Sequence, residues 1–189
     1  MTDDRSRPTP SVHGRPLGAA FFARDACVVA PELLNKRFVV GRCAGRIVEV
    51  EAYTSDDPAA HTFGGRTPRN AVMFGPGGHL YVYFTYGMHH CANVTTGAEG
   101  DGQGVLIRAV TPLAGLALMR RRRGGRTNAQ LTNGPAKLAQ AFGIDLRHNG
   151  SVAGIYDDGV SPPPAPVVGP RVGISRAVDW PRRFRVPPD

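Results

Sequence analysis

Glu51 and Tyr53 have the residue types and the spacing that could support acid–base chemistry. They lie in the segment GRIVEVEAYTSDDPAAH, residues 45–61, which begins with the alternating pattern of a strand. Alternate residues of a strand share one face, so Ile47, Glu49, Glu51 and Tyr53 are expected on the same side. A carboxylate beside an aromatic ring loses hydration, which favours a role as a general base. The alternative is a solvated glutamate at a sheet edge.

Arg108 and His61 are two further polar residues in positions that suggest chemistry. Arg108 lies inside the apolar segment VLIRAV, and an arginine there requires an anion, most simply a carboxylate on a neighbouring strand. Glu49 is in turn expected to face solvent or an arginine. His61 ends a polar loop, where its ring either takes part in a site or caps a backbone carbonyl.

The tyrosines cluster between positions 53 and 86, where four of the five occur. Burial on an amphipathic strand is sufficient to explain Tyr81. Tyr83 and Tyr86 would not share a face of one continuous strand, but Gly87 indicates that the strand ends there. Tyr86 is therefore expected to protrude at a turn, where an aromatic side chain needs a partner.

The sequence lacks the motifs of metal and nucleotide sites. His89 and His90 are adjacent, so on a strand their rings point in opposite directions and do not readily chelate one ion. The three cysteines are scattered without a CxxC pair, which indicates neither a zinc site nor a disulfide framework and is typical of a reducing cytoplasm. GxxxxGK[ST] and GxSxG do not occur, so phosphoryl transfer and serine-hydrolase chemistry have no support. We expect no metal and no cofactor.

The net charge of +8 on 189 residues favours a polyanionic partner. Nearly all of the positive charge comes from arginine, because Lys36 and Lys137 are the only lysines. Arg66, Arg69 and the arginines from Arg120 to Arg126 could form a surface for a polyanion. A genome rich in G and C would also produce such a composition, and a run of arginines is commonly a solvated helix end. Composition therefore leaves nucleic-acid binding open.

Length and patterning indicate one α+β domain. Residues 1–16 contain acids and prolines but no apolar stretch, so we expect a flexible tail rather than a secretory signal, followed by one domain over residues 17–189. No apolar run approaches the roughly 20 residues that cross a bilayer, so no membrane segment is expected. Strands and helices alternate without regular βαβ units, which is typical of the α+β class.

Helix signals are found in three places. Asp25 is expected to cap a helix that continues to about Leu34, with an apolar side made of Val28, Val29, Leu33 and Leu34. Residues 115–123 predict a short helix with a basic end. Asn133 is expected to cap a third helix, with Pro135 in its first turn.

Strand signals surround one long loop. Two strands are expected within residues 37–53, joined by a turn at 41–45, and further strands at 79–87, 91–96 and 104–110. Short strands are expected after residue 150. Residues 54–78 lack regular structure, and a loop of that length usually has a function.

A series of motifs in this chain closely resembles the alkyladenine (3-methyladenine) DNA glycosylase family. In order they are RIVEVEAY, AAH, GGRTPRN, MFGPGGHLYVYFTYGMHHCANV, GVLIRA and NGPAKL, and the resemblance extends from about Leu17 to about Val186. It implies a single α+β domain with a curved antiparallel β-sheet flanked by helices. It also implies hydrolytic release of damaged purines from double-stranded DNA, without a metal or an organic cofactor.

The resemblance assigns the reaction to three residues. Glu51 would be the general base that deprotonates the attacking water, while Arg108 and the backbone carbonyl of Val172 would help to hold that water. The substrates implied are alkylated or deaminated purines: 3-methyladenine, 7-methylguanine, hypoxanthine and ethenoadenine.

The resemblance also assigns residues to substrate binding. Tyr53, His61 and Tyr83 would form the walls that stack on the flipped base, and Asn93 would exclude the 2-amino group of guanine. Tyr86 would enter the minor groove and fill the gap left by the extruded nucleotide. The DNA-facing surface would comprise Arg66, Arg69, Met73 and Met88.

Two other functions remain open from the sequence. One is a damaged-DNA-binding module without catalytic activity, and the other is an N-glycosidase that acts on RNA or on nucleosides. If the chain is a glycosylase, it is expected to be monofunctional, because neither lysine is among the residues assigned to the reaction or to base binding and a Schiff-base lyase step needs one. We expect a monomer that is cytoplasmic and associated with the nucleoid.

Overall fold

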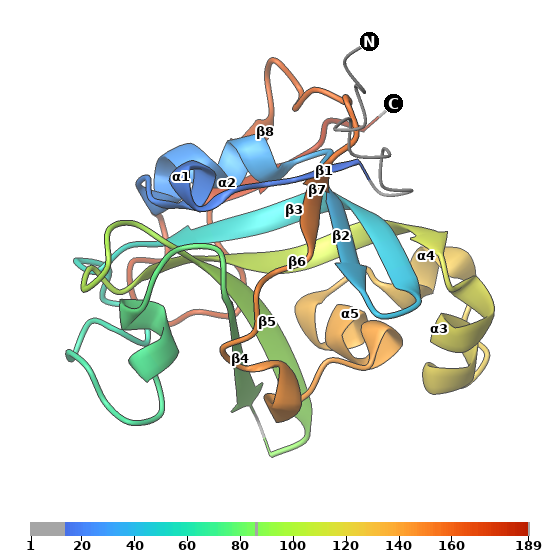
Figure 1. Ribbon diagram of the computed structural model, residues 1–189, viewed down its shortest axis with the longest axis horizontal. Coiled ribbons are helices and arrows are strands. Elements are labelled where there is room, and N and C mark those ends of the chain that lie inside the picture. The colour runs from blue at the N-terminus through green and yellow to red at the C-terminus, as the bar shows by residue number, and fades with distance from the viewer. Residues whose placement is uncertain (1–13, 86, 189) are drawn as a thin grey trace, which may run out of the picture.

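The computed structural model describes residues 14–85 and 87–188. These residues form a nine-stranded sheet in which every pairing between strands is antiparallel. The strands are β1 (Arg15–Pro16), β2 (Arg37–Val40), β3 (Cys43–Tyr53), β4 (Leu80–Thr85), β5 (His89–Thr96), β6 (Gln103–Ala114), β7 (Ile155–Asp157), β8 (Val167–Gly169) and β9 (Arg183–Arg185). Together with helices on both faces, this curved sheet confirms the predicted α+β class (Figure 1).

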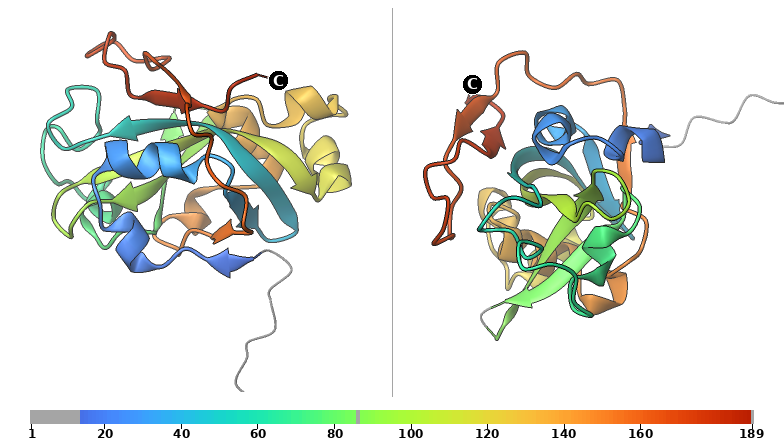
Figure 2. Two further views of the ribbon diagram at one scale, coloured as in Figure 1. Left: turned by 90° about the horizontal axis from the view of Figure 1, so that it is seen from above. Right: turned by 90° about the vertical axis from the view of Figure 1, so that its left-hand side faces the viewer.

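The long strand β3 is the centre of the sheet. The strand order is β1-β7-β2-β3-β6-β5-β4, and β9 joins β3 while β8 pairs with β9. β6 pairs with β3 along almost its whole length, whereas β2 and β9 pair with successive parts of its other edge. Figure 2 shows β8 and β9 beside β3, so the C-terminal part of the chain lies next to the strand that carries Glu51.

The helices are short and cover both faces of the sheet (Figure 1). The α-helices are α1 (Ala19–Phe22), α2 (Ala26–Leu33), α3 (Leu116–Arg122), α4 (Asn128–Leu131) and α5 (Pro135–Phe142), and the 3-10 helices are η1 (Ala71–Phe74) and η2 (Leu146–His148). The core between helices and sheet includes the stacked rings of Phe38 and Phe142, whose centroids are 5.5 Å apart.

Helix α2 begins as the sequence predicts. The Asp25 carboxylate accepts a hydrogen bond from the Cys27 N–H at 2.8 Å and caps the helix. The buried side contains Val29 and Leu33, but the expectation for Val28 is wrong, since Val28 is 47% exposed. At 3.6 residues per turn, Val28 lies on the flank of the face formed by positions 26, 29 and 33.

Helix α5 corrects a second expectation. Its N-cap residue is Gly134, not Asn133, and Pro135 is in its first turn as predicted. Asn133 instead forms an isolated β-bridge with Ala109, and its side-chain oxygen accepts a hydrogen bond from Lys137 Nζ at 3.0 Å. The pairing with β6 keeps Asn133 extended, so the helix begins one residue later than a cap at this position requires.

An irregularity in β3 decides which side chains share a face. The β3–β6 pairing shifts register between Ile47 and Glu49 and again between Glu49 and Val50. Ile47, Val50 and Ala52 are all fully buried in one apolar core. The expectation that Ile47 lies on the face of Glu51 is therefore wrong, because a bulge reverses the alternation of side chains along a strand.

The ordered sheet begins earlier than the predicted domain boundary. Arg15 and Pro16 form β1 and pair with β7, so they do not belong to a flexible tail. The rest of the expected tail, residues 1–13, lies outside the described residues. In the part of the chain that the structure describes, no helix has both the length and the apolar character needed to cross a membrane.

Candidate active site

A cavity of about 520 Å³ brings together side chains from five parts of the chain. This volume is in the range of small-molecule sites in proteins. The walls come from the end of β3, the loop after it, the paired strands β4 to β6, the start of α5 and residues 172–176. The predicted catalytic and base-binding residues that line it are Tyr53, His61, Tyr83, Asn93, Arg108 and Val172.

Glu51 lies directly behind the wall of this cavity and is 0% exposed. Its Oε1 accepts a hydrogen bond from the Val172 N–H at 2.8 Å and lies 3.2 Å from Arg108 Nη1. Its Oε2 accepts a hydrogen bond from the Tyr53 hydroxyl at 2.9 Å. All three partners line the cavity, whereas Glu51 is not among the described lining residues. A buried carboxylate needs hydrogen-bond donors or a positive charge to offset its loss of hydration, and here the groups that provide them also form the cavity wall.

Val172 reaches Glu51 through a different atom from the one expected. The contact is made by the backbone N–H, and the expected role of the Val172 carbonyl as a water ligand stays a prediction. Val172 itself is 49% exposed and lies in an irregular segment between β8 and β9.

Arg108 and Glu49 confirm the expectation that each needs an oppositely charged partner. Arg108 Nε donates to Glu49 Oε1 at 3.0 Å, and Arg183 Nε donates to the same oxygen at 2.6 Å. Positive and negative groups therefore alternate in the order Arg183 on β9, Glu49 on β3, Arg108 on β6 and Glu51 on β3. Arg108 therefore serves two carboxylates, and Arg183 balances the additional negative charge.

Tyr53 is held as a neutral hydrogen-bond donor. Burial raises the pKa of its hydroxyl well above the ordinary value, and the negative charge of Glu51 raises it further. The Arg171 guanidinium lies over the Tyr53 ring, 4.5 Å from its centre. The hydroxyl thus remains protonated and directs its hydrogen bond to Glu51.

The opposite wall is aromatic. The His61 and Tyr83 rings meet edge to face with centroids 4.4 Å apart, and the Tyr83 and Tyr81 rings stack at 5.6 Å. Tyr81 is buried as predicted, but its hydroxyl also lies 3.1 Å from His61 Nδ1, a role that no sequence signal indicates. Removal from water, and secondly the charge of Arg69, lower the pKa of His61, which favours a neutral ring.

Met73 corrects one prediction and extends the description of the cavity. It was expected on the DNA-facing surface, but it is 4% exposed and lines the cavity. The 3-10 helix η1 carries it inward against Gly104 of β6, where an added Cβ would meet the Met73 methyl at 2.8 Å. Asn93, on the adjacent strand β5, is 6% exposed and lines the same cavity.

The residues expected to face DNA have different environments. Arg66 and Arg69 are exposed, and Arg69 Nη2 donates to the Phe84 carbonyl at 3.1 Å. Met88 is 69% exposed in the turn between β4 and β5. Tyr86, the expected wedge, lies outside the described residues.

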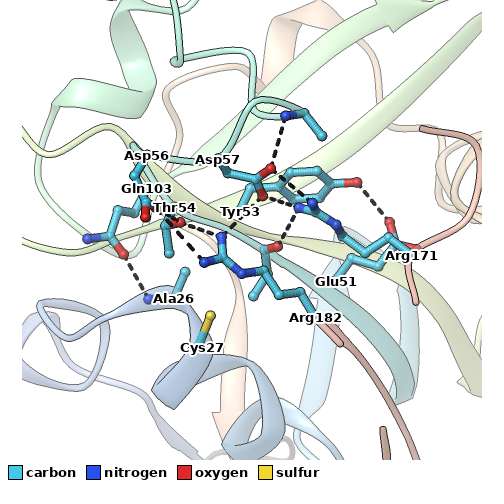
Figure 3. A network of polar contacts seen from close by, with 12 residues as sticks. Ala26, Cys27, Glu51, Tyr53, Thr54, Asp56, Asp57, Gln103, Arg171 and Arg182 are labelled. Carbon is cyan, nitrogen blue, oxygen red and sulfur yellow. Dashed lines mark hydrogen bonds and ion pairs between the residues drawn. The ribbon is translucent and has the colours of Figure 1, made fainter. Parts of the chain in front are cut away.

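A buried ion pair that no sequence pattern indicates lies next to Glu51 (Figure 3). The side chains of Arg171 and Asp57 are both 0% exposed, and Arg171 donates to both carboxylate oxygens, one of them at 2.9 Å. Arg171 Nη1 also donates to the Ala52 carbonyl at 3.0 Å, and Arg182 Nη1 lies 3.3 Å from Asp57. Arg171 and Asp57 are 114 residues apart in the sequence, so no local pattern could have predicted their contact.

Metal-ligating side chains are dispersed in this region. Within residues 14–85 and 87–188, no group of three or more His, Cys, Asp or Glu side chains could hold a metal ion.

Comparisons with known proteins show the family to which the chain belongs. The family model described as "Methylpurine-DNA glycosylase (MPG)" matches residues 20–189. A protein of Burkholderia lata named "Putative 3-methyladenine DNA glycosylase" is 54% identical over 196 residues, which cover 97% of this chain and 93% of that protein. Proteins of the same name from Rhodopseudomonas palustris (strain HaA2) and Burkholderia cenocepacia (strain HI2424) are 48% and 52% identical, with the same coverage.

These matches define the class as DNA glycosylases, which are hydrolytic N-glycosylases of DNA repair. The chain belongs to the methylpurine-DNA glycosylase (MPG) family, whose match extends from α1 to the C-terminal residue. The resemblance that the sequence motifs indicate is confirmed, and with it the class of hydrolytic N-glycosylases.

Proposed function

We propose that this glycosylase removes alkylated or deaminated purines from duplex DNA, with Glu51 as the general base that activates the attacking water. The proposed substrates are 3-methyladenine, 7-methylguanine, hypoxanthine and ethenoadenine. The product is an abasic site. Neither of the two lysines lines the cavity, which supports simple hydrolysis without a Schiff-base intermediate.

The observation that carries the proposal is the set of donors around Glu51. An ionised carboxylate has about four acceptor positions. The Val172 N–H, Arg108 and the Tyr53 hydroxyl occupy three of them at 2.8, 3.2 and 2.9 Å. One acceptor position, on Oε2, is not taken by these donors, and because Glu51 is 0% exposed the attacking water takes it only after side chains of the wall move aside. As the water oxygen bonds to the sugar carbon, Glu51 takes the proton, the N-glycosidic bond breaks and the purine leaves with the bonding electrons.

The aromatic wall supports the proposed base binding. A base inside a duplex cannot be reached, so the nucleotide must rotate out of the stack at a cost of a few kcal/mol. Stacking on aromatic side chains is worth about 1–3 kcal/mol per base and offsets part of this cost. A cationic base such as 3-methyladenine gains a further cation–π contribution. A neutral His61 is compatible with such a cation, because a protonated ring would repel it.

Tyr86, Arg66 and Arg69 are the proposed contacts with the duplex. Thr85, the last residue of β4, lines the cavity, and Met88 in the turn that follows is exposed. Tyr86, between them in the sequence, is proposed to fill the space of the extruded nucleotide as minor-groove wedges do. Arg66 and Arg69 are proposed to contact phosphates, which would make affinity fall steeply with salt.

The substitution Glu51→Gln tests the proposed general base. Release of hypoxanthine and of 3-methyladenine from duplex DNA, measured in single turnover, is expected to fall by about 100-fold or more, as loss of a general base commonly does. Affinity for the lesion duplex should stay within a few-fold of the wild type. Glu99→Gln, in an exposed turn, is the matched control and should release both bases normally.

The same assay separates the alternatives. A binding module would show no release by the wild-type chain. An N-glycosidase for RNA or nucleosides would release bases from those substrates at least as fast as from duplex DNA. Borohydride treatment during the reaction is expected to trap no covalent enzyme–DNA adduct, and a trapped adduct would contradict simple hydrolysis.

A further inference from the structure

Arg171 and Asp57 are two fully buried charges that the proposed chemistry does not use. A buried ion pair is weak evidence for stability, because removing both charges from water costs about as much as their attraction returns. The pair therefore needs another explanation. Its position suggests one, since it lies between Tyr53 and the segment that carries Val172 (Figure 3).

Arg171 connects the groups that hold Glu51. It donates to Asp57 in the loop after β3 and to the carbonyl of Ala52, the residue between Glu51 and Tyr53. Its guanidinium also lies 4.5 Å from the centre of the Tyr53 ring. The next residue in the chain is Val172, whose N–H donates to Glu51 Oε1 at 2.8 Å. The Arg171 side chain thus contacts the strand and the Tyr53 ring, and its backbone leads directly to the Val172 N–H that donates to the carboxylate.

The segment around Val172 has little else to determine its position. It lies between β8 and β9 without a strand or helix of its own, and Val172 is half exposed. The rest of the C-terminal region is held separately by the β3–β9 pairing and by the hydrogen bond from the Ala52 N–H to the Arg182 carbonyl at 2.8 Å. Loss of Arg171 would therefore release the Val172 N–H while β9 remains in place.

We propose that Arg171, held by Asp57, is a positioning residue that sets the Val172 N–H and the Tyr53 hydroxyl on Glu51. This inference rests on the proposed role of Glu51 as general base. Arg171 itself does not line the cavity among the described residues, so its effect is on the orientation of the carboxylate and not on the DNA. Lysine at this position would keep the charge but not the planar, multidentate contacts with Asp57 and Ala52.

The test compares base release with lesion binding and with folding. The variants are Arg171→Lys, Arg171→Ala and Asp57→Asn. Single-turnover release from a hypoxanthine duplex is expected to fall about 10- to 100-fold in each, because small misplacements of catalytic groups have effects of this order. Affinity for the duplex should change less than about threefold, because stacking is retained. Thermal unfolding of each variant reports how much of the loss is structural.

Chemical rescue provides a readout that a purely structural role would not give. Guanidinium ion at millimolar concentration is expected to restore release about tenfold in Arg171→Ala, because it can occupy the position of the missing side chain beside Asp57. It should have no such effect on Asp57→Asn or on Arg171→Lys. If Arg171→Ala fails to fold, the lysine variant still decides the rate and affinity comparison.

Asp158→Asn is the matched control. Asp158 pairs with Arg46 at 2.8 Å near the other end of β3, with both side chains largely buried. This variant should release hypoxanthine at the wild-type rate. Any of three results overturns the proposal. The Arg171 variants release hypoxanthine at the wild-type rate, Asp158→Asn loses as much activity as they do, or guanidinium fails to restore base release by a folded Arg171→Ala.

Glu51→Gln, measured in parallel, separates this inference from the proposed function. Normal release by Glu51→Gln would contradict the general-base assignment whatever Arg171 does. Lost release by Glu51→Gln with normal release by the Arg171 variants would contradict only the positioning role.

Discussion

The two walls of the cavity are built from different kinds of interaction. The wall from β4 and the loop before it consists of rings, with His61 against Tyr83 at 4.4 Å and Tyr83 stacked on Tyr81 at 5.6 Å. The wall around β3 and β6 consists of ion pairs and charge-assisted hydrogen bonds centred on Glu51 and Arg108. Rings accept planar ligands with little directional preference, whereas ion pairs fix the orientation of one group. We infer that the aromatic wall determines affinity and the charged wall determines rate.

The difference also extends to how the walls are assembled. The rings of Tyr81 and Tyr83 lie on one strand, β4, and His61 lies on the loop that precedes it in the sequence. The charged wall joins β3 to C-terminal residues more than a hundred positions away in the sequence, Arg171, Val172 and Arg183. A site assembled from distant segments depends on the whole fold for its geometry.

The largest expected effect, after that of Glu51 itself, comes from removing the cation of the charged wall. Arg108→Met leaves Glu49 paired only with Arg183 and removes the ion pair with Glu51. Breaking a largely buried pair in this way is expected to destabilise the protein by about 3 kcal/mol. Base release at saturating enzyme should fall by about 100-fold. Urea unfolding and single-turnover release measure the two effects.

Arg183→Met is the control for Arg108. It removes a partner of Glu49 but no contact of Glu51, so it should affect stability more than rate. Equal rate losses in both variants would show that the charged wall acts as a whole rather than through Glu51.

A smaller effect is expected from the aromatic wall. Tyr83→Ala removes a stacking surface worth about 1–3 kcal/mol, so the Kd for a lesion duplex should rise by about tenfold or more. The rate of release at saturation should change much less. Tyr83→Phe keeps the ring and should bind as the wild type does. A selective loss of rate without a loss of affinity in Tyr83→Ala would contradict the division between the walls.

The smallest effect concerns protonation of His61. Because burial and then Arg69 lower its pKa, the NMR titration midpoint of the His61 ring should lie below the ordinary value of 6.5. Arg69→Gln removes only the second cause and should move the midpoint part of the way back. A midpoint at or above 6.5 in the wild type would show that neither removal from water nor the charge of Arg69 lowers the pKa of His61.

This lowered pKa also determines the sign of a pH effect on stability. The unfolded chain binds the His61 proton near pH 6.5, whereas the folded chain binds it only at lower pH. Protonation of His61 therefore favours unfolding, and its contribution to stability, complete above pH 6.5, is lost as the pH falls towards the lowered value. His61→Gln should unfold with a weaker pH dependence than the wild type in this window.

Local patterns predicted those features that depend on neighbours in the sequence. The Asp25 cap, the strands that carry Glu51 and Tyr83, and the burial of Tyr81 all follow from capping and alternation. The need of Arg108 for a carboxylate also followed from its apolar surroundings, and the structure supplies Glu49 and Glu51.

Predictions failed where tertiary contacts override the local pattern. The bulge in β3 turns Ile47 into the core, and the bridge to Ala109 takes Asn133 out of its expected cap. Met73 is drawn into the cavity because η1 folds against Gly104. In each case a partner distant in the sequence decides the position of the side chain.

The sequence by itself determined the class of fold, the strands and the family to which the chain belongs, because these depend on residue order and periodicity. Only the tertiary structure decided that Asp57 meets Arg171 and that the Val172 N–H meets Glu51. These contacts join residues 114 and 121 positions apart. Contacts at such separations leave no periodic signal, because they depend on how the C-terminal strand β9 is placed beside β3.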